Sequence, residues 1–253
     1  MKSLEIVDCS TSQKSFAVPA LVATIGPAGK RPAASQISAR TEHSALAQLS
    51  EAEKLRLLRR RIRRDAQCGQ YESAIRLLSY LIYHHPGQAN DYNNRGLMYQ
   101  YRQQWSKAMA DFNQALTLQP TADRIYNNRA NCYAAQQDWL NALDDYDRAI
   151  DINPFNMRAR INQAVTFREM GQYEDALECF DIAMFFGQPN ASLLAERGRT
   201  NHLHGHWNCA ARDYGLALEA LRTDAVCLAR SRSVLKKRVQ LWEKALLAAG
   251  TQP

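Results

Sequence analysis

A strict 34-residue period is the feature that most restricts how this chain can fold. An aromatic residue recurs at this interval five times, and an alanine follows each one by three residues: Tyr71 and Ala74, Trp105 and Ala108, Trp139 and Ala142, Tyr173 and Ala176, Trp207 and Ala210. A fixed period of this length is typical of stacked helical repeats, in which neighbouring units bury a continuous core. The period therefore predicts an all-α solenoid, and it favours binding over catalysis.

Five units of equal length follow one another along the chain, at 55–88, 89–122, 123–156, 157–190 and 191–224. The large and small residues of the second unit are Tyr92, Gly96, Tyr99, Ala108, Phe112, Ala115 and Pro120. Those of the third unit are Tyr126, Ala130, Tyr133, Ala142, Tyr146, Ala149 and Pro154. This pattern resembles the tetratricopeptide repeat (TPR), of the type common in bacteria and photosynthetic organelles, and the resemblance covers about two-thirds of the chain.

The resemblance implies a right-handed helical solenoid in which each unit is a pair of helices. We expect a short turn between the two helices near Gly69, Gln103, Gln137, Gly171 and Gly205. Proline cannot continue a helix, so the units should end near Pro86, Pro120 and Pro154. Small residues on the first helices let the second helix approach closely, while aromatic side chains fill the space beside them. Most aromatic residues are thereby assigned to packing rather than to base stacking or an active site.

The two ends of the chain depart from the repeat. Residues 1–50 lack helical periodicity and are predicted to form a flexible tail, followed by the repeat domain at 51–224 and a capping helix at 225–250. The apolar stretch Phe16–Ile25 has two open uses, as a docking segment or as a targeting signal. Near the C-terminus, Val239, Trp242 and Leu246 share one stripe. This stripe predicts either a cap folded on the last repeat or a homodimer contact through 239–248.

Several polar residues stand where helices should begin. Ser50 followed by Glu53 predicts a capping box at the start of the first helix. Asp123, Asn156 and Asn190 stand at the corresponding N-cap positions of later units.

Composition and charge restrict the compartment and the partners. The net charge of +7 is a moderate basic bias that suits an acidic partner. Six cysteines occur singly, with no CxxC pair, which indicates reduced thiols and a cytoplasmic location. No apolar run reaches the roughly 18 residues of a membrane-spanning helix, so we expect no transmembrane segment.

Motifs that carry chemistry are not found in the sequence. It has no phosphate-binding glycine loop, nucleophile elbow or HExxH zinc motif, so we expect no catalytic residues, no cofactor and no enzyme activity. The carboxylates of one second helix predict a solvated acidic face: Asp144, Asp145, Asp147 and Asp151. His202, His204 and His206 point to different faces of a helix, and no nearby ligand completes a tetrahedral set, so no metal site is predicted.

Polar residues on the first helices form the candidate binding site. TPR proteins line a concave groove with these helices, and some hold an acidic C-terminal peptide there with Lys and Asn. The positions that this resemblance selects are Arg59, Arg63, Asn94, Arg124, Asn127, Asn128, Asn131, Arg158 and Asn162. Arginine offers a bidentate contact to carboxylate or phosphate, and asparagine offers a donor and an acceptor to a peptide backbone. We therefore predict a non-catalytic adaptor or complex-assembly factor that binds an acidic peptide or protein segment in a basic, Asn-rich groove.

Alternatives to this groove stay open, among them contact of the basic clusters at 54–64 and 230–238 with an anionic membrane surface. Another is that the polar strip is only a solvated surface. A third is a nucleic-acid-associated scaffold, which would contact backbone phosphates through the same two clusters.

Overall fold

The computed structural model describes residues 50–187, 190–223 and 229–249, and in this part of the chain the regular elements are helices. Their bounds are α2 (Glu51–Gln67), α3 (Tyr71–His84), α4 (Ala89–Tyr101), α5 (Trp105–Leu118), α6 (Asp123–Ala135), α7 (Trp139–Ile152), α8 (Met157–Glu169), α9 (Tyr173–Phe186), α10 (Ala191–His204), α11 (Trp207–Thr223) and α12 (Ala229–Ala249). The all-α solenoid is confirmed. Of the predicted N-terminal tail, only Ser50 belongs to the described residues, so Phe16–Ile25 lies outside them.

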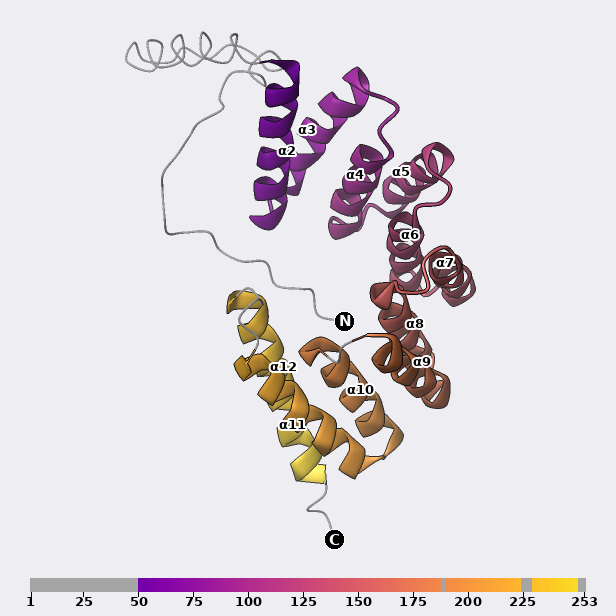
Figure 1. The fold of residues 1–253 in the computed structure, drawn as a ribbon, viewed down its shortest axis with the longest axis vertical. Helices are drawn as coiled ribbons and strands as arrows, with labels where there is room; N and C mark the ends of the chain where they lie inside the picture. Colours follow the sequence, from indigo (N-terminus) through magenta and orange to yellow (C-terminus); the bar gives the residue numbers. More distant parts are fainter. Residues whose placement is uncertain (1–49, 188–189, 224–228, 250–253) are drawn as a thin grey trace, which may run out of the picture.

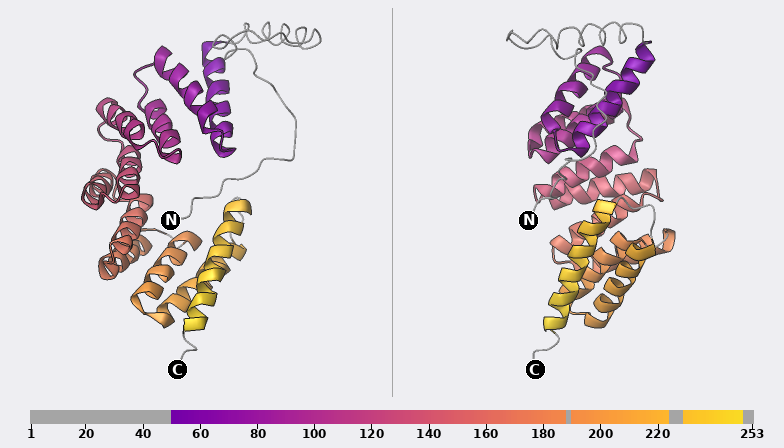
Figure 2. Two further views of the ribbon diagram at one scale, coloured as in Figure 1. Left: turned by 180° about the vertical axis from the view of Figure 1, so that it is seen from behind. Right: turned by 90° about the vertical axis from the view of Figure 1, so that its left-hand side faces the viewer.

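The helix pairs stack into an arc that opens on one side (Figure 1). Helices α5, α7 and α9 lie on the outer side of the arc, and α4, α6, α8 and α10 lie on the inner side, in both the front and the rear view (Figures 1 and 2). The first described helix, α2, and the last, α12, stand at the two ends of the arc and leave its inner side open between them (Figure 2). The first helices of the units therefore form the inner surface.

The turns inside the units lie where the sequence predicts them. All five turn residues have a positive φ, between 58° and 87°: Gly69, Gln103, Gln137, Gly171 and Gly205. This left-handed conformation reverses the chain after the first helix, and it suits glycine better than glutamine. The two glutamines accept it because the turn also closes with backbone hydrogen bonds, such as the one from Gln104 N to Tyr99 O at 2.9 Å.

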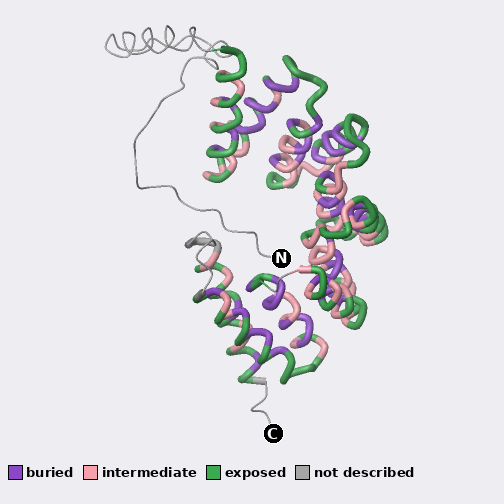
Figure 3. The backbone as a smooth tube through the Cα atoms, in the orientation of Figure 1, coloured by how far each residue is buried: buried purple, intermediate pink, exposed green. Residues whose placement is uncertain are grey.

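The core of the second to fifth units is a large ring from the second helix against a small residue of the first; in the first unit Leu78 and Ile62 take these places. The rings of Phe112, Tyr146, Phe180 and Tyr214 recur at the same place in successive units and are at most 1% exposed. A Cβ atom built on Gly96 would lie 2.8 Å from the Phe112 ring, so only glycine fits there without movement. Buried positions accordingly lie where helices face one another, while the outer surface of α7 is exposed (Figure 3).

The helix starts confirm three of the four predicted caps. Ser50 and Glu53 form the capping box, and Asn156 and Asn190 accept hydrogen bonds from the backbone amides of Ala159 and Leu193. The prediction for Asp123 is wrong, because the N-cap of α6 is Ala122 and makes no side-chain bond. Asp123 is instead the first helical residue, and its carboxylate accepts hydrogen bonds from the amides of Asn153 and Asn156 at 2.8 and 2.9 Å.

Helix α12 packs on the last repeat. Val239 and Leu246 are buried in one cluster with residues of α10 and α11, and Trp242 lies partly buried against it. This packing is that of a cap. Two other leucines of the helix, Leu241 and Leu247, are about two-thirds exposed, and a homodimer through 239–248 remains a prediction.

Candidate binding surface

Three arginines of the first helices are used by the solenoid itself. Each donates two hydrogen bonds, at 2.6 to 2.9 Å, to the carboxylate of the aspartate 16 residues later. The pairs are Arg95 with Asp111, Arg129 with Asp145, and Arg197 with Asp213. The third nitrogen of each arginine reaches a side chain of the preceding unit, at Ser79, Asn113 and Asp181. Each arginine therefore fixes the two helices of its own unit and joins that unit to the one before it.

These pairs correct the prediction of a wholly solvated acidic face. Asp144, Asp147 and Asp151 are exposed, but Asp145 is only 2% exposed and is held by Arg129. The hydrogen bond to Asp145 is the main cause of the raised pKa of Arg129. In the fourth unit Gln163 and Cys179 take the places of the arginine and the aspartate, with 3.9 Å between sulfur and amide oxygen.

Most of the predicted groove asparagines bond to other side chains of the protein. Asn128 Nδ2 donates to Asn93 Oδ1 at 2.8 Å, and Asn162 Nδ2 donates to Asn127 Oδ1 at 2.9 Å. These two bonds join first helices of successive units. Asn127 is only 7% exposed, so this residue serves packing more than an incoming ligand.

Asn131 and Asn94 have side-chain amide groups that are available to hydrogen-bond with a partner. Asn131 Oδ1 accepts a 2.7 Å hydrogen bond from the buried hydroxyl of Tyr146, while its Nδ2 has no hydrogen bond to another described residue. Asn94 is half-buried, and its side chain has no such bond either. These two amides remain able to contact a backbone.

The predicted arginines of the strip lie mostly free on the surface. Arg63, Arg124 and Arg158 are exposed and form no ion pair within the described residues. Arg59 is about half exposed and lies 3.2 Å from a carboxylate oxygen of the buried Asp91. Arg56 and Arg60, on the same helix as Arg63, are also exposed. The described structure thus contains unpaired cations on α2, α6 and α8.

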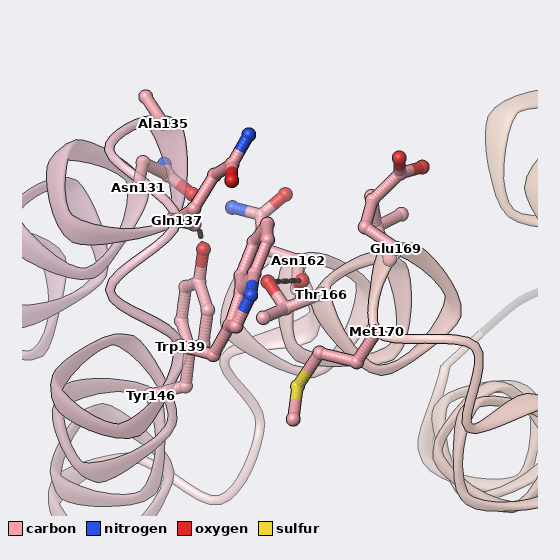
Figure 4. A pocket seen from close by; sticks show the side chains of 11 residues that line it. Asn131, Ala135, Gln137, Trp139, Tyr146, Asn162, Thr166, Glu169 and Met170 are labelled. Carbon is pink, nitrogen blue, oxygen red and sulfur yellow. Dashed lines mark hydrogen bonds between the residues drawn. The ribbon is translucent and has the colours of Figure 1, made fainter.

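A pocket of about 590 Å³ lies between the third and fourth units. It is lined by residues of α6, of the turn at Gln137, of α7, and of α8 with its C-cap Met170. In Figure 4 the Trp139 ring stands beside Tyr146, and Glu169 and Met170 stand on the opposite side. Asn131 and Asn162, both members of the predicted strip, also line it. Its volume lies within the range of about 300 to 1,000 Å³ that is common for ligand sites.

Chemically reactive groups are few on this surface. Burial raises the pKa of the Cys132 and Cys179 thiols to about 11, so both are protonated at neutral pH. Among the described residues, no three His, Cys, Asp or Glu side chains gather as metal ligands. None of the helices described is both long and apolar enough to cross a membrane.

Sequence reasoning missed the arginine–aspartate pairs and the pocket. The pairs leave a signal, because the arginines and the aspartates each follow the 34-residue period and keep a constant separation. The pocket leaves no such signal in the sequence of a single unit, because its lining comes from two successive units that pack together.

Comparison with known proteins agrees with this architecture. Two models of the tetratricopeptide repeat match the chain, one at 89–122 and 124–156 and another at 145–178. A comparison with curated protein sequences finds no significant match.

Solved structures of similar fold come from several sources. PilF of Pseudomonas aeruginosa is 16% identical, with 78% of this chain and 89% of that chain covered and a TM-score of 0.60. MamA (41 to the end) from Desulfovibrio magneticus RS-1 is 18% identical over 67% of this chain and 96% of that one, with a TM-score of 0.55. A chain of the APC/C hetero-tetramer Cut9–Hcn1 is 16% identical over 73% of this chain and 35% of that one, with a TM-score of 0.62. At this identity the likeness concerns the fold.

Proposed function

Because the chain is a tetratricopeptide repeat protein, we propose that it is a non-catalytic scaffold that binds an acidic protein segment along the inner side of its arc. Membership of this family supports a role in protein–protein interaction. The acidic nature of the segment and its place on α2, α6 and α8 are the finer part of the proposal.

The observation that carries the proposal is the division of the arginines into two groups. Arg95, Arg129 and Arg197 are satisfied by buried aspartates, so they are needed for the fold. Arg63, Arg124 and Arg158 are exposed on first helices and form no ion pair within the described residues. Arginine forms strong bidentate hydrogen bonds to carboxylates. The carboxylates of an acidic segment could bind each of these three arginines in this way.

Asparagines beside these arginines suit the backbone of the same segment. Asn131 keeps its amide donors after bonding Tyr146, and Asn94 is half-buried without a hydrogen bond to another described side chain. An extended segment exposes an N–H and a C=O at every residue, and an amide side chain can bond either group. The asparagines would position the segment, and the arginines would select its charge.

Charge reversal on the inner surface tests the proposal. Peptides are first selected from a random phage-displayed library with the unaltered protein, and their affinities are then measured by fluorescence polarisation. We expect Arg124→Glu with Arg158→Glu to weaken binding about tenfold or more, as loss of central interface residues does. The matched control is Arg148→Glu with Arg212→Glu, which makes the same charge change at exposed arginines of the second helices α7 and α11.

The outcomes separate the two surfaces. Equal peptide affinities of the unaltered protein and of Arg124→Glu with Arg158→Glu would contradict the groove assignment. Loss in both variants to the same degree would show that only the net charge matters.

Nucleic acid is the second candidate, favoured by the exposed cations at both ends of the arc. Arg60 and Arg63 lie on α2, and Lys236 and Lys237 lie on α12. Binding through several phosphates would weaken steeply with salt, because counterions are released. A gel-shift series with RNA and DNA at increasing salt tests this function, and no shift at low salt removes it.

A further inference from the structure

At two junctions of this solenoid, successive units place rings against one another at the turn. The aromatic residue that opens a second helix faces the last residues of the first helix in the next unit. Tyr101 stacks on Tyr71 with 5.1 Å between ring centroids and 14° between planes. His204 lies against Tyr173 at 5.4 Å and 41°. Two of the units thus cover their turn aromatic with a ring supplied by the following unit.

The second and third units have the aromatic residue without the covering ring, and the pocket lies at that of the third. Trp139 is the equivalent of Tyr71 and Tyr173. Glu169 follows Tyr101 by two repeats of 34 residues and so stands at the equivalent position. Met170 precedes His204 by one repeat and is its equivalent. Both residues line the 590 Å³ pocket together with Trp139. The pocket is therefore the space that a ring of the chain itself occupies elsewhere.

We propose that this pocket is a seat for one aromatic side chain of the partner segment, stacked on the ring of Trp139. This inference rests on the proposed function, because it names a side chain of the segment that the inner surface binds. Offset stacking at centroid distances of about 4.5 to 7 Å is favourable, and both internal ring pairs lie within that range.

The walls and rim of the pocket suit a ring with a polar edge. Val165, Met170 and Trp139 supply apolar wall, and a thioether beside an aromatic ring is itself a favourable contact. Asn131 and Gln137 supply amide groups on the side of the pocket shown at the top of Figure 4. A phenol hydroxyl or an indole N–H of the ligand can bond to such groups.

The charge of the pocket favours a neutral ring over an arginine or an acidic side chain. Glu169 is the charged residue among those that line it, and Arg168 neutralises this carboxylate at 3.1 Å. A guanidinium would therefore meet a carboxylate that already has a cation. An acidic side chain would meet a carboxylate and amides rather than the free arginines of α2, α6 and α8.

A variant that fills the seat tests the proposal. Glu169→Tyr places a tyrosine beside Trp139 at the position from which Tyr101 stacks on Tyr71. We expect random peptides selected by the unaltered protein to carry one aromatic residue at a fixed position. Glu169→Tyr should lower the affinity of those peptides about tenfold and remove the aromatic preference in a new selection, while the acidic preference stays.

A second measurement reports on the seat without any peptide. N-acetyl-tyrosinamide should shift the indole N–H signal of Trp139 in a ¹H–¹⁵N spectrum of the full chain. N-acetyl-leucinamide should shift it less, and neither should do so in Glu169→Tyr. Assignment of the signal comes from the spectrum of Trp139→Phe.

The results distinguish failure of the seat from failure of the groove. An unmoved Trp139 signal, an aromatic preference that survives Glu169→Tyr, or a preference for arginine would each overturn the seat. Failure of the charge-reversal test with a shifting Trp139 signal would overturn the acidic groove and leave the seat standing.

Discussion

Arg129 offers a sharp test of how this solenoid is held together, because the chain contains its own control. Its Nε and one terminal nitrogen each lie 2.7 Å from the Asp145 carboxylate, which is 2% exposed, and the other terminal nitrogen lies 2.7 Å from Asn113 Oδ1. Arg129→Gln leaves this buried carboxylate without its cation. Breaking a buried pair in this way costs about 3 to 5 kcal/mol, a large part of the roughly 5 to 15 kcal/mol that a domain has.

The double variant Arg129→Gln with Asp145→Cys should recover most of that loss. It places in the third unit the glutamine and cysteine that the fourth unit carries at the equivalent positions, Gln163 and Cys179. Removing both charges also removes the desolvation of the carboxylate, so we expect a free energy of unfolding within about 1 kcal/mol of the parent.

Urea denaturation followed by far-UV circular dichroism, under reducing conditions, measures both variants. Hydrogen exchange of the amides in α6 and α7 locates the change, since a solenoid is stabilised by contacts within and between neighbouring units. A loss below about 1 kcal/mol in the single variant would refute the reasoning about burial. A double variant as unstable as the single one would show that Gln163 and Cys179 do not form an equivalent pair.

Three further predictions concern stability. Gly96→Ala should cost about 1 to 3 kcal/mol in chemical denaturation, because its Cβ would lie 2.8 Å from the Phe112 ring. Gly215→Ala, which meets nothing within 4 Å in a helix interior, should instead add about 0.5 to 1 kcal/mol, and equal effects would contradict the packing argument. Gln103→Gly should raise the midpoint of unfolding by relieving a residue at φ 58°, and a lower midpoint would show that the glutamine side chain matters more. Burial, followed by the charge of Arg199, lowers the pKa of His202, so the folded state binds this proton more weakly than the unfolded chain. Stability should therefore fall as pH drops through the ordinary histidine pKa of about 6.5, and His202→Gln should flatten that fall in denaturation curves measured across this range.

The fold was predictable from the sequence because each unit repeats the same local chemistry. The turn at Gly205, the caps at Ser50 and Asn190, and the rings at Phe112 and Tyr146 each follow from residues close in sequence or from the period itself. The N-cap at Asp123 was wrong because the helix starts at that residue, and the carboxylate bonds to asparagines about 30 residues later. Such distant partners are not visible in a local pattern.

The candidate site was less predictable than the fold. Asn127 and Asn128 have the spacing of groove residues, yet each bonds to an asparagine of a neighbouring unit. Asp145 belongs to an acidic run and is nonetheless buried, because Arg129 comes to it from the other helix. Whether a polar residue faces a ligand or a neighbouring helix depends on the rotation between units, which the sequence of one unit does not contain.

The arginine that joins each unit to the preceding one also governs how such an array can grow. If the third unit were duplicated in tandem, the arginine of the copy, equivalent to Arg129, would stand beside Asp147, where the native fourth unit places Gln163. Duplication would thus add an arginine–carboxylate ion pair at the new junction, while Gln163 would keep its hydrogen bond to the equivalent aspartate of the copy. If the fourth unit were duplicated, the glutamine of the copy would stand beside Asp181. The new junction would then lack an ion pair like the one between Arg197 and Asp181. The units are therefore unequal as building blocks, and the third is the better suited to lengthening the solenoid.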